Sequence, residues 1–331
     1  MTFESLCKIV DGEYLNLPSV NAYEKIETKP HLIKRGDLYV GNEQEAIHQA
    51  IENGAYGILH EGEAIMIDEE VAWIRVSSID EALIRLLRFS LLKSDLRFFY
   101  FPEIEYDILR QILQKDHVIF LQSDVKKNFH KILKAQNNSY FICDNQFFLK
   151  SIYPEFITYH DKNQSLLKLT HQTLFLSSFT YNDIHYENIK LPSLFLSELN
   201  RVLHFAQESN LDFDIEKLAF IKIFQPLFIS NQLTIRPFGD SEHVFIVIND
   251  EKQIDTTLAY IQKMATWANI LLFIPTQETI ISDVATHHYT QLHEVNDIDI
   301  NKFNFILILA NYNALTNILQ NNKKEQNISL F

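Results

Sequence analysis

Short apolar runs and helix-spaced apolar positions alternate along the first part of the chain. Apolar residues between Ala46 and Ile51 recur at the spacing of one helix face, which predicts an amphipathic helix. Gly54 follows this helix, where a residue of positive φ is expected because glycine has no Cβ. Strands that alternate with helices are typical of an α/β fold. The expected strands are 37–40, 55–59 and 71–76, and the expected helices are 43–53 and about 80–92.

The alternation continues through the rest of the chain with one interruption. From about 167 to 191 the texture changes to β-strand runs, such as Thr173 to Leu176, with a polar hairpin tip near Asn182 and Asp183. Beyond residue 94 the other expected strands are 118–121, 140–143, 243–248, 270–274 and 303–309, and the expected helices are about 128–135, 192–209, 255–268 and 314–319.

This pattern predicts three α/β segments, at 1–93, 94–232 and 233–331. Strands separated by helices in the last segment favour a small parallel sheet. The aromatic block at 98–101 is expected in core or interdomain packing, and the alternative is a partner surface. The apolar runs have the length of strands and fall short of the roughly 20 residues of a membrane span, so no membrane insertion is expected.

Composition narrows the chemistry. The chain has seven glycines, and none lies between Gly62 and Gly239. Loops that cradle phosphates need glycine for positive φ and close backbone approach, so neither a P-loop nor a dinucleotide fingerprint fits that stretch. The net charge of -14 without a basic face argues against nucleic acid. Two separated cysteines and an N-terminus unlike a signal peptide favour a reducing cytoplasm.

The N-terminal segment resembles the Mur ligases of peptidoglycan synthesis. Residues 33–40, Ile-Lys-Arg-Gly-Asp-Leu-Tyr-Val, are similar to the Pro-Gly-Asp-Leu-Phe-Val run before that family's first core strand, and residues 46–55 are similar to its Ala-Ile-x-x-Gly-Ala stretch. The resemblance is closest to the ligase that adds D-alanyl-D-alanine. It implies three α/β domains, with a shortened central domain and a small Rossmann-like C-terminal domain.

The strand at 118–121 leads into a segment that corresponds to the family's ATP-binding loop, Thr-Gly-(Ser/Thr)-x-Gly-Lys-(Thr/Ser). A lysine falls on the phosphate lysine, but the glycine positions hold Ser123 and Lys126, and an asparagine replaces the hydroxyl that binds Mg²⁺. A lysine without the surrounding backbone nest is a poor nucleotide anchor, and an ordinary surface turn is the simpler interpretation. The degenerate loop comprises Gln122, Ser123, Asp124, Val125, Lys126, Lys127 and Asn128.

Two further active-site motifs of the family are replaced in the last segment. Residues 251–254 stand where the family has Tyr-Asn-x-Asn-Pro, and residues 310–313 stand where it has Lys-Gly-Ser-Arg. Amide ligation through an acyl phosphate needs bound ATP phosphates and Mg²⁺. Several independent losses in one mechanism therefore imply no catalytic residues, no cofactor and no metal.

The resemblance also indicates where a UDP-linked precursor would bind. The family's Asp-Ser-Arg, which helps to bind the UDP end, aligns with Lys29-Pro30-His31. Lys34 and Arg35 remain beside it and, with His31, are candidates for contacting the diphosphate. The simpler interpretation of the basic pair is a solvated turn.

Other candidate chemistry is weaker. His287, His288 and His293 form a histidine cluster, but the separation of five between the last two suits a metal poorly on a helix. His204 lies in an apolar helix and is expected to be semi-buried. Cys143 ends an apolar strand, where an inert thiol is expected, and the sequence contains no Gly-x-Ser-x-Gly elbow.

Three hypotheses of function remain. The favoured one is a non-catalytic relative of the Mur ligases, which acts as a scaffold, regulator or precursor-binding protein with other peptidoglycan-synthesis or cell-shape proteins, or a UDP-muramyl-peptide, as its partner. The second is a divergent active ligase on a UDP-muramyl-peptide. The third is a soluble protein that keeps the scaffold for an unrelated binding role.

Overall fold

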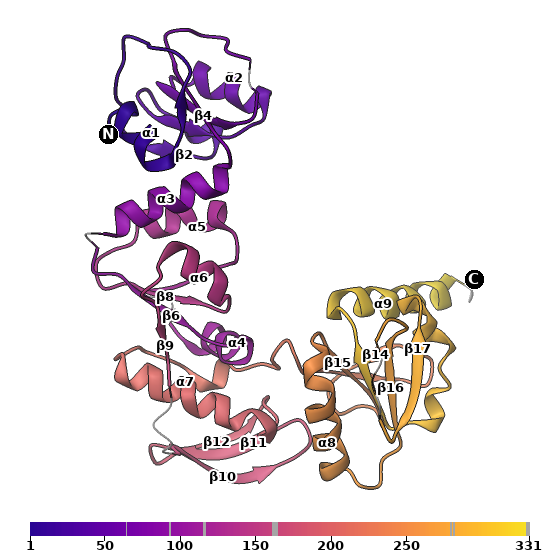
Figure 1. Cartoon of the computed structure of the whole chain (residues 1–331). Coiled ribbons are helices and arrows are strands. Elements are labelled where there is room, and N and C mark those ends of the chain that lie inside the picture. Colours follow the sequence, from indigo (N-terminus) through magenta and orange to yellow (C-terminus); the bar gives the residue numbers. More distant parts are fainter. Residues whose placement is uncertain are drawn as a thin grey trace. The chain divides into compact units, whose positions relative to one another are not determined.

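The computed structural model describes residues 1–63, 65–92, 94–114, 117–160, 165–278, 280 and 282–328, with side chains to residue 321. Helices and strands alternate along most of the chain (Figure 1), which confirms the α/β fold class. The chain forms two compact units, Met1–Pro102 with Lys115–Tyr159 and Glu103–Gln114 with His160–Phe331. Across the described ranges, no helix combines the length and the apolar character that crossing a membrane requires.

The first sheet lies in the first unit and has the strand order β1-β5-β4-β3-β2. β2 to β5 are parallel, and β1 pairs with β5 in the antiparallel sense. Ile47 and Ala50 of α2 pack with Trp73 in one core cluster, and Phe3 of α1 packs with Leu83 of α3 in another. The elements are α1 (Phe3–Val10), β1 (Glu13–Tyr14), β2 (Ile26–Glu27), the 3-10 helix η1 (Pro30–Leu32), β3 (Leu38–Val40), α2 (Gln44–Glu52), β4 (Gly57–Glu61), β5 (Ala72–Val76) and α3 (Ile79–Leu91).

Local signals define the helix ends of this region. Thr2 accepts a hydrogen bond from the Ser5 amide at 3.2 Å, which caps α1. Gly54 has a φ of +96° just beyond α2, which confirms the glycine expected there. α3 packs against α1, α5 and α6, so it joins the first sheet to the second one within this unit.

The second sheet of this unit is parallel, with the order β7-β8-β6-β9. Three residues of the aromatic block at 98–101 lie in β6, and Phe98, Phe99 and Phe101 are in the core, as expected: Phe98 is 1% exposed and stacks on Phe141 and Tyr153, each at 4.6 Å between ring centroids. The elements are β6 (Arg97–Tyr100), β7 (Val118–Phe120), α5 (Val125–Leu133), β8 (Tyr140–Cys143), α6 (Gln146–Ile152) and β9 (Ile157–Thr158). Cys143 is buried, and burial raises the pKa of its thiol to about 11, as an inert thiol requires.

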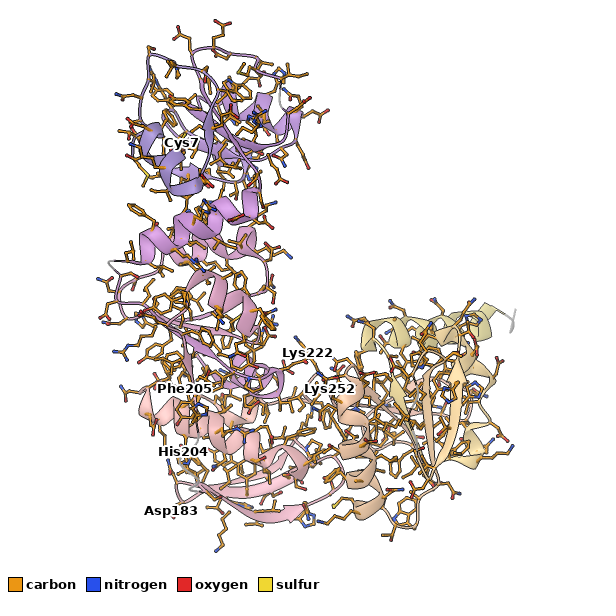
Figure 2. All side chains as sticks on the ribbon, in the orientation of Figure 1. Cys7, Asp183, His204, Phe205, Lys222 and Lys252 are labelled. Atoms are coloured by element: carbon orange, nitrogen blue, oxygen red, sulfur yellow. The ribbon has the colours of Figure 1, made fainter. Side chains whose placement is uncertain are left out.

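The second unit contains an antiparallel meander of β10 (Leu167–Gln172), β11 (Ser177–Tyr181) and β12 (Ile184–Ile189). Asn182 and Asp183 form the tip at φ of +49° and +62°, as a tight two-residue hairpin requires; Figure 2 labels Asp183. The strand expected at 173–176 is wrong. Those residues form the turn between β10 and β11, because the Thr173 hydroxyl accepts hydrogen bonds from the amides of Phe175 and Leu176 at 3.3 and 2.9 Å.

Two helices, α4 (Glu103–Ile112) and α7 (Leu196–Glu208), pack together in the second unit. Glu105 of α4 is 3% exposed, and its Oε1 accepts hydrogen bonds from Nε and Nη2 of Arg201 at 2.8 and 2.6 Å. His204 and Phe205 of α7, labelled in Figure 2, are also buried, which agrees with the sequence-based prediction for His204. The 3-10 helices η2 (Ser193–Phe195) and η3 (Ile215–Lys217) flank α7.

The last sheet has the order β14-β13-β15-β18-β16-β17, and β15, β18, β16 and β17 are parallel, which confirms the parallel sheet expected there. β13 also belongs to this sheet and pairs with β15 in the antiparallel sense. The boundaries at 93 and 232 remain predictions. The elements are β13 (Gln225–Ile229), β14 (Ile235–Arg236), β15 (His243–Ile248), η4 (Glu251–Gln253), α8 (Ile254–Met264), β16 (Ile270–Pro275), β17 (Ala285–Tyr289), η5 (Leu292–Asp297), η6 (Ile300–Lys302), β18 (Phe305–Leu309) and α9 (Tyr312–Ile328).

The histidine cluster lies partly on this sheet. His287 and His288 are consecutive residues of β17, so their side chains point to opposite faces, and the helical spacing considered from the sequence does not apply. Within the described ranges, no three histidine, cysteine, aspartate or glutamate side chains come together as metal ligands would.

Candidate functional site: a basic pocket beside a closed loop

A pocket of about 770 Å³ lies in the first unit, between the carboxyl end of β3 and the first turns of α5. The carboxyl ends of parallel strands are where α/β sheets usually hold ligands. Gly41 helps to form the pocket, because a Cβ at this position would collide with the Tyr39 hydroxyl. The lining residues are Thr28, Lys29, Pro30, Tyr39, Val40, Gly41, Asn42, Glu43, Ala46, Ile79, Gln122, Lys126, Lys127, His130 and Lys131.

The lining concentrates positive charge in a chain whose net charge is -14. Four lysines line the pocket, against one carboxylate, Glu43. Lys126 Nζ lies 3.3 Å from Asp80 Oδ1, whereas Lys29 and Lys131 make no ion pair with any residue that the structure describes. The pocket is therefore suited to an anion, since its unpaired ammonium groups can approach one at little cost.

The N-terminus of α5, next to this pocket, is occupied by the chain itself. Asp124 Oδ1 accepts a hydrogen bond from the Lys127 amide at 3.1 Å, and Asp124 Oδ2 lies 3.7 Å from Lys127 Nζ. The free amides of a helix N-terminus are the groups that hold phosphate in nucleotide-binding loops. Here a carboxylate takes the place of that phosphate and pairs with the lysine that would contact it.

Asn128 closes the same loop from the inside. Its side chain is 0% exposed, its Oδ1 accepts a hydrogen bond from the Gln122 amide at 3.3 Å, and its Nδ2 donates one to the Gln122 carbonyl. The residue at the position of the Mg²⁺ hydroxyl therefore faces the loop backbone. Its two hydrogen bonds hold residues 122 and 128, the ends of the loop, together.

The helix expected at 128–135 is corrected at this point. α5 begins at Val125, because Asp124 is an N-cap whose side chain bonds to the third residue after it. This start places residues 127, 130, 131 and 134 at helical spacing. The bulk of the degenerate loop is thus the first turn of a helix.

Helix caps also occupy the other two positions where the resemblance led us to look for active-site loops. Asp250 Oδ1 accepts a hydrogen bond from the Lys252 amide at 3.0 Å at the start of η4. Asn311 Oδ1 accepts one from the Ala314 amide at 3.1 Å at the start of α9. In all three segments, a short polar side chain accepts a hydrogen bond from a backbone amide of the chain itself.

Some of the candidate residues predicted from the sequence line the pocket, and others lie outside it. Gln122, Lys126 and Lys127 line the pocket, whereas Ser123 is exposed and Val125 is in the core. His31, Lys34 and Arg35 are exposed but do not line the pocket. Lys34 and Arg35 lie at the amino end of β3, where Arg35 Nε donates to the Tyr56 hydroxyl at 3.1 Å and the Lys34 amide donates to Asp37.

Sequence reasoning missed Thr28, His130 and Lys131, and it placed Lys29 at the family's UDP-binding motif without naming it as a candidate. The sequence did contain a signal for the α5 residues. Aspartate is a preferred N-cap residue, so Asp124 could have been recognised as the residue before the helix. With the helix begun at 125, the cations at 127, 130 and 131 would have been placed on neighbouring turns of one helix. For Lys29 the signal was its alignment with the family's Asp-Ser-Arg.

His130 is the most enclosed of the basic residues that line the pocket, with 22% of its side chain exposed. Its Nε2 lies 3.2 Å from Glu27 Oε2 and 3.4 Å from Thr28 Oγ1. Burial lowers the pKa of His130; Glu27 opposes this effect, and Lys134 and Lys29 add to it. Glu27 is 8% exposed. Its Oε2 is close enough to His130 Nε2 for an ion pair, but it makes no hydrogen bond with a described residue.

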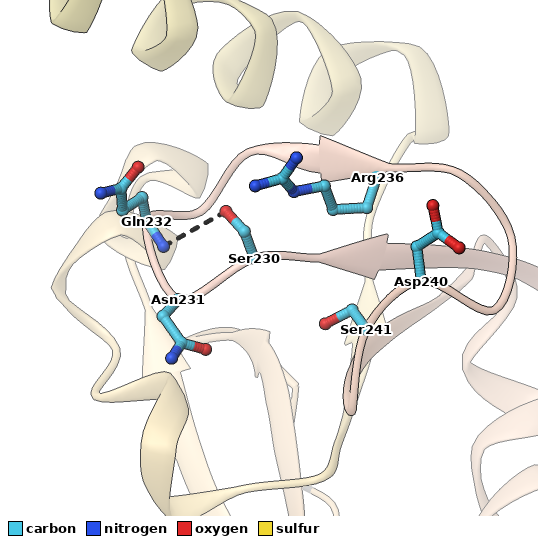
Figure 3. A pocket seen from close by; sticks show the side chains of 6 residues that line it. All are labelled: Ser230, Asn231, Gln232, Arg236, Asp240 and Ser241. Carbon is cyan, nitrogen blue, oxygen red and sulfur yellow. Dashed lines mark hydrogen bonds between the residues drawn. The ribbon is translucent and has the colours of Figure 1, made fainter.

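Two other cavities are lined by residues that the structure describes. Figure 3 shows one of about 580 Å³ around the β13–β14 hairpin, where the Gln232 amide donates to Ser230 Oγ at 3.3 Å. It contains one cation, Arg236, and one anion, Asp240, and both residues are exposed. Another, of about 450 Å³, lies at the amino ends of β7 and β8 and the carboxyl end of α5; His117, Lys131 and Lys134 line it, and the helix dipole there disfavours an anion.

Comparisons with known proteins identify the fold. No family model matches the chain, and no curated protein matches its sequence. Among solved structures, a MurF ligase from Thermotoga maritima in complex with ADP matches with a TM-score of 0.52 and 12% identity, covering 90% of this chain and 96% of that one. A MurF from Acinetobacter baumannii matches with a TM-score of 0.47 and 9% identity, covering 98% of this chain and 93% of that one.

At 12% identity such a match speaks for the fold and not for the activity. It agrees with the motif at residues 33–40 and with the order of elements expected from the sequence. The chain has the α/β fold of a Mur ligase, similar to that of MurF.

Proposed function

We propose that the chain is a non-catalytic Mur-ligase-like protein of peptidoglycan synthesis that binds a UDP-muramyl-peptide precursor in the basic pocket. The observation that carries this proposal is the contrast within α5. Asp124 and Asn128 close the start of the helix, while Lys127, His130 and Lys131 remain on the pocket side. The start of α5 therefore argues against ATP binding, while the side chains of the same helix support the binding of an anion.

The charge and size of the pocket support a diphosphate-bearing ligand. A volume of about 770 Å³ lies within the range of small-molecule sites. Lys29 and Lys131 make no ion pair with a described residue, two such ammonium groups match the two phosphates of a diphosphate, and lysine serves as a point charge for phosphate. A UDP-linked precursor has two phosphates and a long extension. By binding this precursor, the chain would regulate or act as a scaffold for other cell-wall or cell-shape proteins.

One observation favours a second candidate, a divergent UDP-muramyl-peptide ligase. Lys127 stands at the position of the phosphate lysine and lines the pocket. Its ammonium group lies against Asp124, however, and the Asp124 carboxylate also accepts a hydrogen bond from the Lys127 amide. We therefore favour the non-catalytic function.

Replacing Lys29 and Lys131 together by alanine tests the proposed site. Each ammonium contributes roughly 1 kcal/mol at about 4 Å from a phosphate in water, so the pair should contribute about 2 kcal/mol, or roughly 30-fold in affinity. Calorimetric titration of UDP-muramyl-tripeptide into the full chain measures this change. Both side chains are exposed, so the variant should fold normally.

The comparison variant is Lys34→Ala/Arg35→Ala, which removes the same charge from the opposite end of β3. It should change the affinity by less than about threefold, because screening weakens exposed charges beyond roughly 8 to 10 Å. If this variant loses binding and Lys29→Ala/Lys131→Ala keeps it, the basic pair singled out from the sequence is the site. If the wild-type chain binds no UDP-muramyl-tripeptide, the proposal fails.

A further inference from the structure

The most enclosed part of the basic pocket is built from an imidazole and a buried carboxylate. His130 lines the pocket, and its Nε2 lies 3.2 Å from Glu27 Oε2, on a residue that is 8% exposed. We propose that His130 binds the ligand's phosphate as an imidazolium, with Glu27 as the counter-charge behind it, so that affinity for the ligand rises as pH falls. This inference rests on the proposed function and assigns a proton-linked contact to the same site.

The geometry gives the imidazolium two partners. A protonated histidine has two N–H donors, and a neutral one has a single donor. Nε2 faces Glu27 Oε2, which is a buried acceptor with no hydrogen bond. The other nitrogen, Nδ1, makes no hydrogen bond with any residue that the structure describes, so its N–H remains for an anion. Only the charged form of His130 can therefore satisfy the buried carboxylate and donate to a phosphate at the same time.

The charges around His130 set the direction of the effect. Glu27 faces it from β2, Lys29 from the segment after β2, and Lys134 from the next turn of α5, while Thr28 adds an uncharged hydroxyl at 3.4 Å. In the empty pocket, burial and the two lysines outweigh Glu27, so the pKa of His130 lies below its ordinary value of about 6.5. A bound phosphate opposes both lysines and raises that pKa.

Proton uptake on binding follows from this difference. Between the lowered pKa of the free pocket and the raised pKa of the complex, ligand binding takes up a proton at His130. Affinity then increases as pH falls through this window and becomes constant below it. Each unit by which the ligand raises the pKa contributes about tenfold in affinity.

The test is calorimetric titration of UDP-muramyl-tripeptide into the full wild-type chain between about pH 5.5 and about pH 8, where histidine is the side chain that ordinarily titrates. Two buffers of different ionisation enthalpy at each pH report the number of protons taken up. A phosphodiester diphosphate has no titration of its own in this range, so any uptake belongs to the protein. The measurement needs no variant and is unaffected by one that folds poorly.

Two variants assign the proton. His130→Gln keeps an N–H donor but cannot titrate, so it should bind without proton uptake and lose the rise in affinity at low pH. His48→Gln, which alters an exposed histidine of α2 outside the pocket, should keep both. Glu27→Gln removes the counter-charge and should move the window to lower pH.

Uptake of a fraction of one proton by the wild type, absent in His130→Gln and present in His48→Gln, supports the inference. Binding that is independent of pH and buffer overturns it while leaving the precursor site in place. An absence of binding at every pH overturns the proposed function, and the inference with it.

Discussion

Replacing Glu105 by alanine is expected to lower the free energy of unfolding by about 3–5 kcal/mol. The side chains of Glu105 and Arg201 are 4% and 30% exposed, and both Nε and Nη2 of Arg201 donate to one carboxylate oxygen. Removing the carboxylate leaves the guanidinium partly buried, with Glu198 at 3.1 Å as its remaining partner. Chemical denaturation of the wild-type chain and the variant measures the loss.

Two further variants distinguish the effect of burying the ion pair from the effect of removing a charge. Glu4→Ala removes a carboxylate from an exposed ion pair with Lys8 and should leave the stability essentially unchanged. Replacing Glu105 and Arg201 together by methionine should recover most of the stability, because a buried pair replaced by apolar groups leaves no unpaired charge. A Glu105→Ala variant as stable as Glu4→Ala would show that the pair does not join α4 to α7 as described.

The Phe129→Ala variant is expected to lose about 3–5 kcal/mol of unfolding free energy. Phe129 lies on the inner face of α5, is 0% exposed, and belongs to the apolar core of the first unit. Truncation of its ring leaves a cavity beneath the helix that carries His130 and Lys131. The affinity of the basic pocket for UDP-muramyl-tripeptide should fall with it, since the two side chains lose their fixed support.

Phe147→Ala is the matched control, because that ring on α6 is 87% exposed. It should change the stability by no more than about 0.5 kcal/mol. Thermal or denaturant unfolding of the two variants side by side gives the comparison. Equal stability of the two would contradict the placement of α5 against the core.

The elements that the sequence predicted well are those whose faces are uniformly apolar. β15, β16 and β18 are buried along their lengths, so their runs of Ile, Leu, Val and Phe identify them without tertiary information. α4 escaped prediction because Glu105 and Asp107 are buried on it. Arg201 and the Lys222 amide, both from distant parts of the sequence, satisfy these carboxylates, and no local pattern records such partners.

The candidate site was predictable only in part, for a related reason. The absence of glycine around Lys127 predicted a defective phosphate loop, because the need for glycine in such a loop can be read from the local sequence. The replacement of the phosphate by Asp124 and the inward turn of Asn128 depend on where α5 starts. Lys29 and His130 come from segments about 100 residues apart, so only the folded chain brings them to one pocket.

Formation of ADP from Mg-ATP by the purified chain, in the presence of UDP-muramyl-tripeptide and D-alanyl-D-alanine, tests the central claim most directly. With the start of α5 closed by Asp124 and Asn128, we expect no ADP above the level of a Lys127→Ala variant purified in the same way. ADP formation that requires the tripeptide and disappears in Lys127→Ala would contradict the account, because it would mean that the loop opens to hold the phosphates for catalysis.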